Sequence, residues 1–172
     1  MKNMFNLFVT LLVSGFTLSQ QTALTGKSIQ DSLVLTHMPE WAKPVLEKSE
    51  LVKNYKIQRE FNPYYFEGDF NGDKLIDIAF FVENTIDHSK GLMFINGGKN
   101  LVFIVGCGNA TDMGSSITWA KTWFIFRDRI VRNASKKTLP LKTPAILLKG
   151  SKETNLVVYW SRNKYKTFLQ QY

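Results

Sequence analysis

The sequence predicts a mainly β (α+β) fold, an antiparallel sheet or meander of hairpins with one short N-terminal helix packed on it. Three observations lead to this prediction. From residue 55 onwards, short apolar and aromatic runs alternate with turn residues. Residues 96–99 read NGGK, which indicates a tight hairpin because Asn and Gly accept the positive φ that such turns require. No helical crossovers separate the runs, so a parallel sheet is not expected.

The first residues predict export. Residues 1–19 resemble a secretory signal peptide, with Lys2 ahead of an apolar stretch over 4–18. Thr17 and Ser19 are small enough for the −3 and −1 positions of a cleavage site. An N-terminal membrane anchor that is never cleaved is the alternative.

This interpretation divides the chain into a signal peptide (1–19), a flexible leader (20–32) and a single β-rich domain (33–172). The protein is then expected in the periplasm or secreted from the cell. No later stretch is apolar enough over the roughly 18–20 residues that a spanning helix needs, so no transmembrane segment is expected after signal removal.

The composition limits disulfide formation and the kinds of partner that the chain is expected to bind. The chain has one cysteine, Cys107, so no intrachain disulfide can form, and a lone thiol after an apolar run is typical of a small buried residue. The net charge of +8 permits contact with anionic polymers or surfaces. The basic residues are spread along the chain without a nucleic-acid-binding motif, so specific nucleic-acid binding is not expected.

The helix is expected over residues 39–49. Pro39 suits a first helical turn, and Pro44 must lie close to the start of the helix because an interior proline would kink it. Trp41, Val45 and Leu46 give an apolar stripe of helical period.

Strands are expected wherever apolar, β-branched and aromatic residues gather between turns. The expected runs are 55–61, 78–82, 91–96, 100–105, 117–126, 145–148, 156–160 and 165–169. The third and fourth runs form the hairpin around NGGK, and the last two form a terminal hairpin. Residues 83–90, 106–116 and 136–144 are expected to be loops.

One stretch carries recognisable site chemistry. Residues 68–77 read GDFNGDKLID, which places oxygen-bearing side chains at positions 1, 3, 5 and 9 of a short loop. Ca²⁺ takes six to eight oxygen ligands, several of them carboxylates. The predicted ligands are the side chains of Asp69, Asn71, Asp73 and Asp77 with the backbone carbonyl of Leu75. The alternative is an Asx-rich turn whose side chains cap backbone amides without a metal.

The loop resembles those of FG-GAP/VCBS-type repeats, as in integrin α-subunit propellers, where the loop joins two strands and binds Ca²⁺. An EF-hand is excluded, because position 12 is Phe80 rather than a bidentate Glu. The chain departs from the repeat pattern at Lys74, where glycine is usual, and a single copy cannot build a propeller. A non-glycine residue there is strained if positive φ is required.

A looser resemblance covers most of the chain. It is similar to small exported bacterial proteins of unknown function that carry a GDFNGD loop. The shared features are NPYY at 62–65, the Gly-Gly turn at 97–98 and a Tyr-Trp pair at 159–160. Neither resemblance implies a particular reaction, and the role expected for a Ca²⁺ in the loop is structural.

The sequence contains no recognisable catalytic motif and predicts no catalytic or cofactor-binding residues. His88 stands between Asp87 and Ser89, but sequence neighbours cannot usually adopt the geometry of a catalytic triad. We therefore expect a binding or structural module. A secreted carboxylate-based hydrolase, for example one acting on glycans and holding a structural Ca²⁺, is the alternative.

A glycan or protein partner could bind through exposed aromatic side chains. The candidate rings are those of Trp119, Trp123, Tyr159, Trp160 and Tyr165, and each could equally belong to the core. Two or more exposed and contiguous rings would favour binding, whereas a cleft holding two acids, or an acid and His88, would favour the hydrolase.

Overall fold

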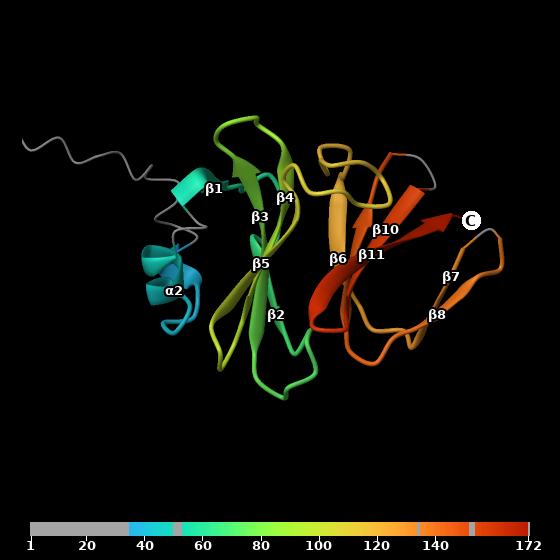
Figure 1. Ribbon diagram of the computed structural model, residues 1–172, viewed down its shortest axis with the longest axis horizontal. Coiled ribbons are helices and arrows are strands. Elements are labelled where there is room, and N and C mark those ends of the chain that lie inside the picture. The colour runs from blue at the N-terminus through green and yellow to red at the C-terminus, as the bar shows by residue number, and fades with distance from the viewer. Residues whose placement is uncertain (1–34, 50–52, 134, 152–153, 172) are drawn as a thin grey trace, which may run out of the picture.

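The computed structural model describes residues 35–49, 53–133, 135–151 and 154–171. The predicted signal peptide and leader lie outside these residues. Two antiparallel sheets pack face to face, with helix α2 (Lys43–Lys48) outside the first sheet and a two-stranded ribbon outside the second (Figure 1). The mainly β fold with a short packed helix is therefore confirmed.

The first sheet has the order β1-β3-β4-β5, and β2 also pairs with β3. Its strands are β1 (Tyr55–Ile57), β2 (Tyr65–Gly68), β3 (Asp77–Asn84), β4 (Lys90–Asn96) and β5 (Leu101–Gly106). The β4–β5 hairpin runs from Gly91 opposite Gly106 to Asn96 opposite Leu101. The hairpin predicted from NGGK is thus confirmed.

The second sheet has the order β11-β10-β9-β6. Its strands are β6 (Thr122–Phe126), β9 (Ala145–Lys149), β10 (Thr154–Ser161) and β11 (Lys164–Gln171). The terminal hairpin is confirmed, with Ser161 opposite Lys164. The ribbon pairs β7 (Ile130–Arg132) with β8 (Thr138–Pro140) between the second sheet's β6 and β9 in the chain.

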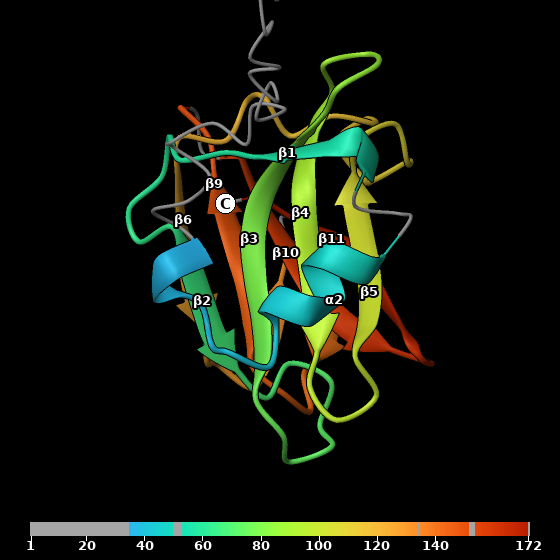
Figure 2. The same cartoon turned by 90° about the vertical axis from the view of Figure 1, so that its left-hand side faces the viewer.

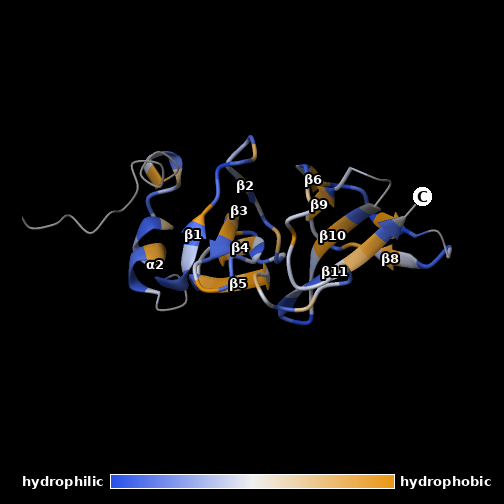
Figure 3. Ribbon diagram, turned by 90° about the horizontal axis from the view of Figure 1, so that it is seen from above, coloured by the Kyte–Doolittle hydropathy of each residue, from blue (hydrophilic) through white to orange (hydrophobic). Residues whose placement is uncertain are grey.

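The main core lies between the two sheets and is built from alternate residues of their strands, whose apolar character is visible in Figure 3. Trp123 of β6 meets Phe81 of β3 edge to face, with ring centroids 4.8 Å apart. Tyr165 of β11 stacks on Phe94 of β4 at 3.7 Å, and its hydroxyl donates to Asn96 Oδ1 at 2.8 Å. Aromatic contacts therefore join the two sheets.

Two further apolar layers cover the outer faces. Ala42 and Leu46 of the helical segment pack on Ile78, Phe80 and Met93 of the first sheet (Figure 2). The ribbon packs in the same way on the outer face of the second sheet. Since both faces of β3 are covered, residues 77–82 are all buried, which explains their nearly continuous apolar run.

Some predicted bounds are wrong. The helix begins at Lys43 rather than residue 39, with Pro44 in its first turn, because proline lacks the N–H that an interior position must donate. The strand expected over 117–126 begins at Thr122, and Trp119 lies in the turn that precedes it. The loop expected over 136–144 contains β8.

The run expected over 55–61 is a strand only at Tyr55–Ile57. No helix among the described residues is long and apolar enough to cross a membrane.

Candidate functional site

Residues 69–77, called the acidic loop below, connect β2 to β3 at the lower end of the molecule in Figures 1 and 2. The strands on either side pair with Gly68 opposite Asp77, so the loop closes a hairpin. All five predicted metal ligands therefore lie on one tight connection, although they differ in burial. Asp77 is fully buried, whereas Asp73 and Leu75 are exposed.

Asp77 organises the loop. Its Oδ2 accepts hydrogen bonds from the backbone N–H groups of Phe70 at 2.9 Å and Asn71 at 3.0 Å. Its Oδ1 accepts from Gly97 N–H at 2.9 Å and from the Asn71 side-chain amide at 3.3 Å. One carboxylate therefore closes the acidic loop and fastens it to the β4–β5 turn.

Burial raises the pKa of Asp77 to about 6, although the N–H groups of Gly97, Asn71 and Phe70 act in the opposite direction by stabilising the charged form. The cost of removing the carboxylate from water is thus the larger effect.

The other oxygen-bearing side chains cap nearby backbone amides. Asp69 accepts from Gly72 N–H at 2.6 Å and from Lys74 N–H at 3.0 Å. Asn71 Oδ1 accepts from Asp73 N–H at 2.8 Å, and Asp73 Oδ1 accepts from Leu75 N–H at 2.9 Å. The contacts of Asn71 and Asp73 are Asx turns, in which a side-chain oxygen takes the place of a backbone acceptor two residues before the N–H donor.

The space between two of the carboxylates is taken by an amide. Asn71 Nδ2 donates to Asp73 Oδ2 at 3.0 Å as well as to Asp77 Oδ1 at 3.3 Å. Within the part of the chain that the structure describes, no three His, Cys, Asp or Glu side chains are grouped as they would be around a metal ion. The oxygen atoms of the acidic loop are of the type that binds Ca²⁺, but in this arrangement they accept hydrogen bonds from N–H groups instead.

Lys74 has φ +71°, so the position where the loops that this stretch resembles usually carry glycine does require a left-handed backbone in this chain. Gly72 has φ +85°. The strain expected at Lys74 is therefore present, at a cost of order 1–2 kcal/mol for a residue with a Cβ.

A cleft of about 790 Å³ opens beside the acidic loop. Three segments form it: the acidic loop, residues 139–144, which comprise the end of β8 and the connection to β9, and the end of the β10–β11 hairpin. Its lining residues are Asp69, Asn71, Gly72, Lys74, Leu139, Pro140, Lys142, Thr143, Pro144, Tyr159, Trp160, Ser161 and Arg162. The volume falls within the roughly 300–1,000 Å³ that is usual for small-molecule sites.

The five candidate aromatic residues divide between core and cleft. Trp123 and Tyr165 are buried between the sheets, and the Trp123 indole N–H donates to the Pro63 carbonyl at 3.1 Å. Trp119 is half-buried in a turn away from the cleft lining. Tyr159 and Trp160 are half-buried neighbours on opposite faces of β10, where Tyr159 packs in the layer beneath the ribbon and Trp160 packs on the main core, and both residues line the cleft.

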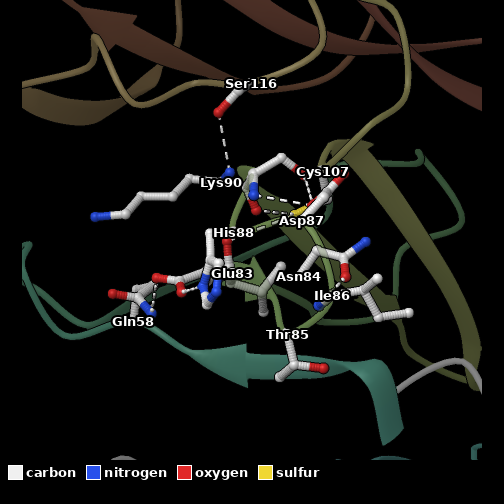
Figure 4. Close-up of polar contacts among 12 residues, drawn as sticks. Gln58, Glu83, Asn84, Thr85, Ile86, Asp87, His88, Lys90, Cys107 and Ser116 are labelled. Atoms are coloured by element: carbon white, nitrogen blue, oxygen red, sulfur yellow. Dashed lines mark hydrogen bonds and ion pairs between the residues drawn. The ribbon is translucent and has the colours of Figure 1, made fainter.

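A second polar cluster lies at the opposite end of β3 (Figure 4). His88 Nδ1 lies 2.8 Å from Glu83 Oε1, and Gln58 donates to the other oxygen of Glu83 at 3.1 Å. Asp87 instead accepts from the backbone N–H and hydroxyl of Ser89, at 2.9 and 2.6 Å. His88 therefore pairs with Glu83, and the Asp87-His88-Ser89 sequence does not form a relay.

Cys107 lies beside this cluster, next to Asp87 in Figure 4, and is buried. Its thiol donates weakly to the carbonyls of Val82 and Ser89, at 3.6 and 3.5 Å. Burial raises the pKa of Cys107 to about 12, so the thiol is neutral at physiological pH and a poor nucleophile. It behaves as the small buried residue that the sequence predicts.

Comparison with known protein families, with functionally described proteins and with solved structures gives no match for this chain. The function is therefore argued from the acidic loop and the cleft.

Proposed function

We propose that this chain is an exported, non-catalytic module that holds one Ca²⁺ in the acidic loop as a structural ion and binds a partner in the adjoining cleft. The observation that carries the proposal is that the acidic loop forms part of the cleft. It lines the same cleft as Tyr159 and Trp160, so a cation that orders the loop also shapes the binding surface.

The loop supplies ligands of the right type. Asp69, Asn71 and Asp73 stand at alternate positions, followed by the Leu75 carbonyl. Each carboxylate oxygen of Asp69 accepts one backbone N–H, which leaves each with a further lone pair. A cation would replace the Asn71 amide as the partner of Asp73 and Asp77. The chemistry it supplies is cross-linking and charge neutralisation within the loop.

The hydrolase alternative needs two carboxyl groups facing each other across a cleft. Among the residues that line the cleft, Asp69 is the one carboxylate, and His88 lies at the other end of β3. No specific observation therefore favours a hydrolase over a binding module.

The Ca²⁺ part of the proposal is tested by thermal unfolding of the protein in millimolar Ca²⁺ and in EDTA. Ca²⁺ at a hundred times its dissociation constant should add about 2.7 kcal/mol to the free energy of unfolding. Asp73→Ala should abolish this gain, because it removes one of the proposed Ca²⁺ ligands. Asp73 is exposed, so its side chain can be removed without disturbing the core.

Asp87→Ala is the matched control, since Asp87 is an exposed carboxylate in a turn outside the acidic loop. It should retain the full Ca²⁺ effect. Identical melts of the unmodified protein in both buffers would refute the ion and leave the binding role of the cleft to be tested separately.

A further inference from the structure

The cleft beside the acidic loop has an unbalanced charge. Its lining includes three cationic side chains, those of Lys74, Lys142 and Arg162, and one carboxylate, that of Asp69. The three cations come from three different segments and converge on one concave surface. Charges of one sign that line a cleft raise the local concentration of ligands of the other sign.

The single carboxylate can offset only one of these three cations. Asp69 is held in place by the backbone N–H groups of Gly72 and Lys74, one on each oxygen. In the part of the chain that the structure describes, none of the three cationic side chains forms an ion pair. The positive charge of the cleft is therefore available to a ligand.

Two of the three cations stand on strained backbone. Lys74 has φ +71°, and Arg162 has φ +51° in the two-residue turn of the terminal hairpin. Such turns favour Gly, Asn or Asp, so a long cationic side chain is an unfavourable choice for stability. Strain of this kind is concentrated at functional sites, and here it occurs twice around one cleft.

The remaining lining suits a sugar. Tyr159 supplies an aromatic ring on the ribbon side of β10, in the same layer as Leu139, and Ser161 adds a hydroxyl that can donate or accept. Trp160, the next residue along the strand, faces the main core, where its ring packs against Phe103 at 5.1 Å and Tyr165 at 4.9 Å and anchors this end of β10. A half-buried ring beside polar groups matches a ligand that has both apolar C–H faces and hydroxyls.

Two of the segments that form the cleft, the acidic loop and residues 139–144, are held together by direct contacts. Thr143 Oγ1 donates to the Phe70 carbonyl at 2.8 Å, which ties residues 139–144 to the acidic loop. The loop approaches so closely that a Cβ on Gly72 would lie 2.9 Å from Thr143 Cγ2. Arg129 also donates to the carbonyl of Lys142 at 3.2 Å.

We propose that this cleft binds an acidic saccharide, with Lys74, Lys142 and Arg162 contacting its carboxylate or sulfate groups and Tyr159 packing on one of its rings. The inference rests on the proposed binding function but does not require the Ca²⁺ ion. Lys74 and Arg162 are specificity-determining residues in this account.

The test is isothermal titration of the protein with four probes: a sulfated heparin-derived tetrasaccharide, a galacturonate tetrasaccharide, neutral cellotetraose and sodium sulfate. At least one acidic saccharide should bind at least about tenfold more tightly than cellotetraose and sodium sulfate, since it alone offers both charge and rings. The stronger of the two acidic probes identifies the anionic group. Because the cations are exposed, affinity should fall as ionic strength rises from roughly 0.05 to 0.5 M.

The decisive variants are Lys74→Gly and Arg162→Gly. Each removes a cation and relieves a positive φ, so the melting temperature should rise while affinity for the acidic probe falls about tenfold. Lys136→Gly is the matched control, because Lys136 also has a positive φ, +59°, but does not line the cleft. It should raise the melting temperature and leave affinity unchanged.

A merely structural role for these lysine and arginine side chains would leave affinity the same in all three variants, and that result would overturn the proposal. Absence of binding by both acidic probes would overturn it as well. Equal binding of cellotetraose and the acidic probes would refute the proposal that the ligand is acidic, while the proposed function of the cleft as a binding site would stand. Binding that is the same in Ca²⁺ and in EDTA would separate this site from the ion proposed for the loop.

Discussion

Strand β3 has a polar cluster at each end, and the two clusters differ in burial and in their hydrogen-bond partners. At its first residue, Asp77 is fully buried and accepts four N–H groups from the acidic loop and the β4–β5 turn. After its last residues, Asp87 and His88 lie in an exposed turn, where Asp87 accepts from Ser89 and His88 contacts Glu83.

The comparison shows why similar side chains contribute differently. A buried N–H that loses its acceptor cannot turn to water, so the full desolvation penalty remains. An exposed group exchanges one partner for another at little cost. The same residue type is therefore a structural requirement at one end of β3 and a replaceable surface group at the other.

The largest expected effect is the loss of the Asp77 carboxylate. Asp77→Ala should lower the free energy of unfolding by about 3 kcal/mol or more, because the buried N–H groups of Phe70 and Gly97 lose their acceptor. Asp87→Ala should be far milder. Chemical denaturation of both variants in EDTA measures the difference, and equal losses would show that burial does not distinguish the two ends.

The second effect is a pH dependence confined to the buried end. The pKa of Asp77 is raised to about 6 in the folded state, above its ordinary value of 3.8, so the folded protein binds more protons than the unfolded chain between these values. Its contribution to the free energy of unfolding should therefore be largest below pH 4 and decline by roughly 2–3 kcal/mol as pH rises to about 6.

Denaturation in EDTA across this pH window, with Asp77→Asn as the control that cannot titrate, isolates this contribution. Bound Ca²⁺ beside the carboxylate would favour its charged form, so millimolar Ca²⁺ should suppress the decline. A contribution from Asp77 that instead grows with pH would mean that the four N–H groups outweigh burial.

The smallest effect is expected at the exposed end. His88 has φ +58°, so asparagine, which tolerates this conformation, is the suitable replacement. His88→Asn removes the contact with Glu83 and should change the free energy of unfolding by about 0.5 kcal/mol or less, because the side chain of His88 is 77% exposed. A decrease in the free energy of unfolding as large as that of Asp77→Ala would show that the fold also depends on this exposed cluster.

Much of the β architecture follows from local sequence. The NGGK turn specifies the β4–β5 hairpin through the conformations that Asn and Gly allow, and the apolar runs of β9, β10 and β11 identify those strands. The helix and β6 start later than predicted, because helical period and β-propensity do not show that a proline or a turn delays the start of an element. The short β8 was missed within a basic stretch, since its pairing with β7 gives little periodic signal.

The aromatic residues could not be sorted from sequence alone. Trp123 and Trp160 occupy strands of similar pattern and pack on the same core, yet Trp123 is buried whereas Trp160 is half-buried and borders the cleft. Which ring is enclosed depends on the facing sheet, and residues of that sheet are distant in the chain. The sharing of the cleft by Lys74, Lys142 and Arg162 is non-local for the same reason.

The sequence by itself determined the acidic loop: its oxygen-bearing residues, its position before a buried strand and the unusual lysine where a glycine is expected. The tertiary structure alone decided what those residues contact. It buries Asp77 beneath the β4–β5 turn, where four N–H groups converge, and turns the outer side of the loop towards residues 139–144 and the terminal hairpin. Local spacing fixes which atoms a loop can offer, whereas burial and long-range packing fix the partners those atoms meet.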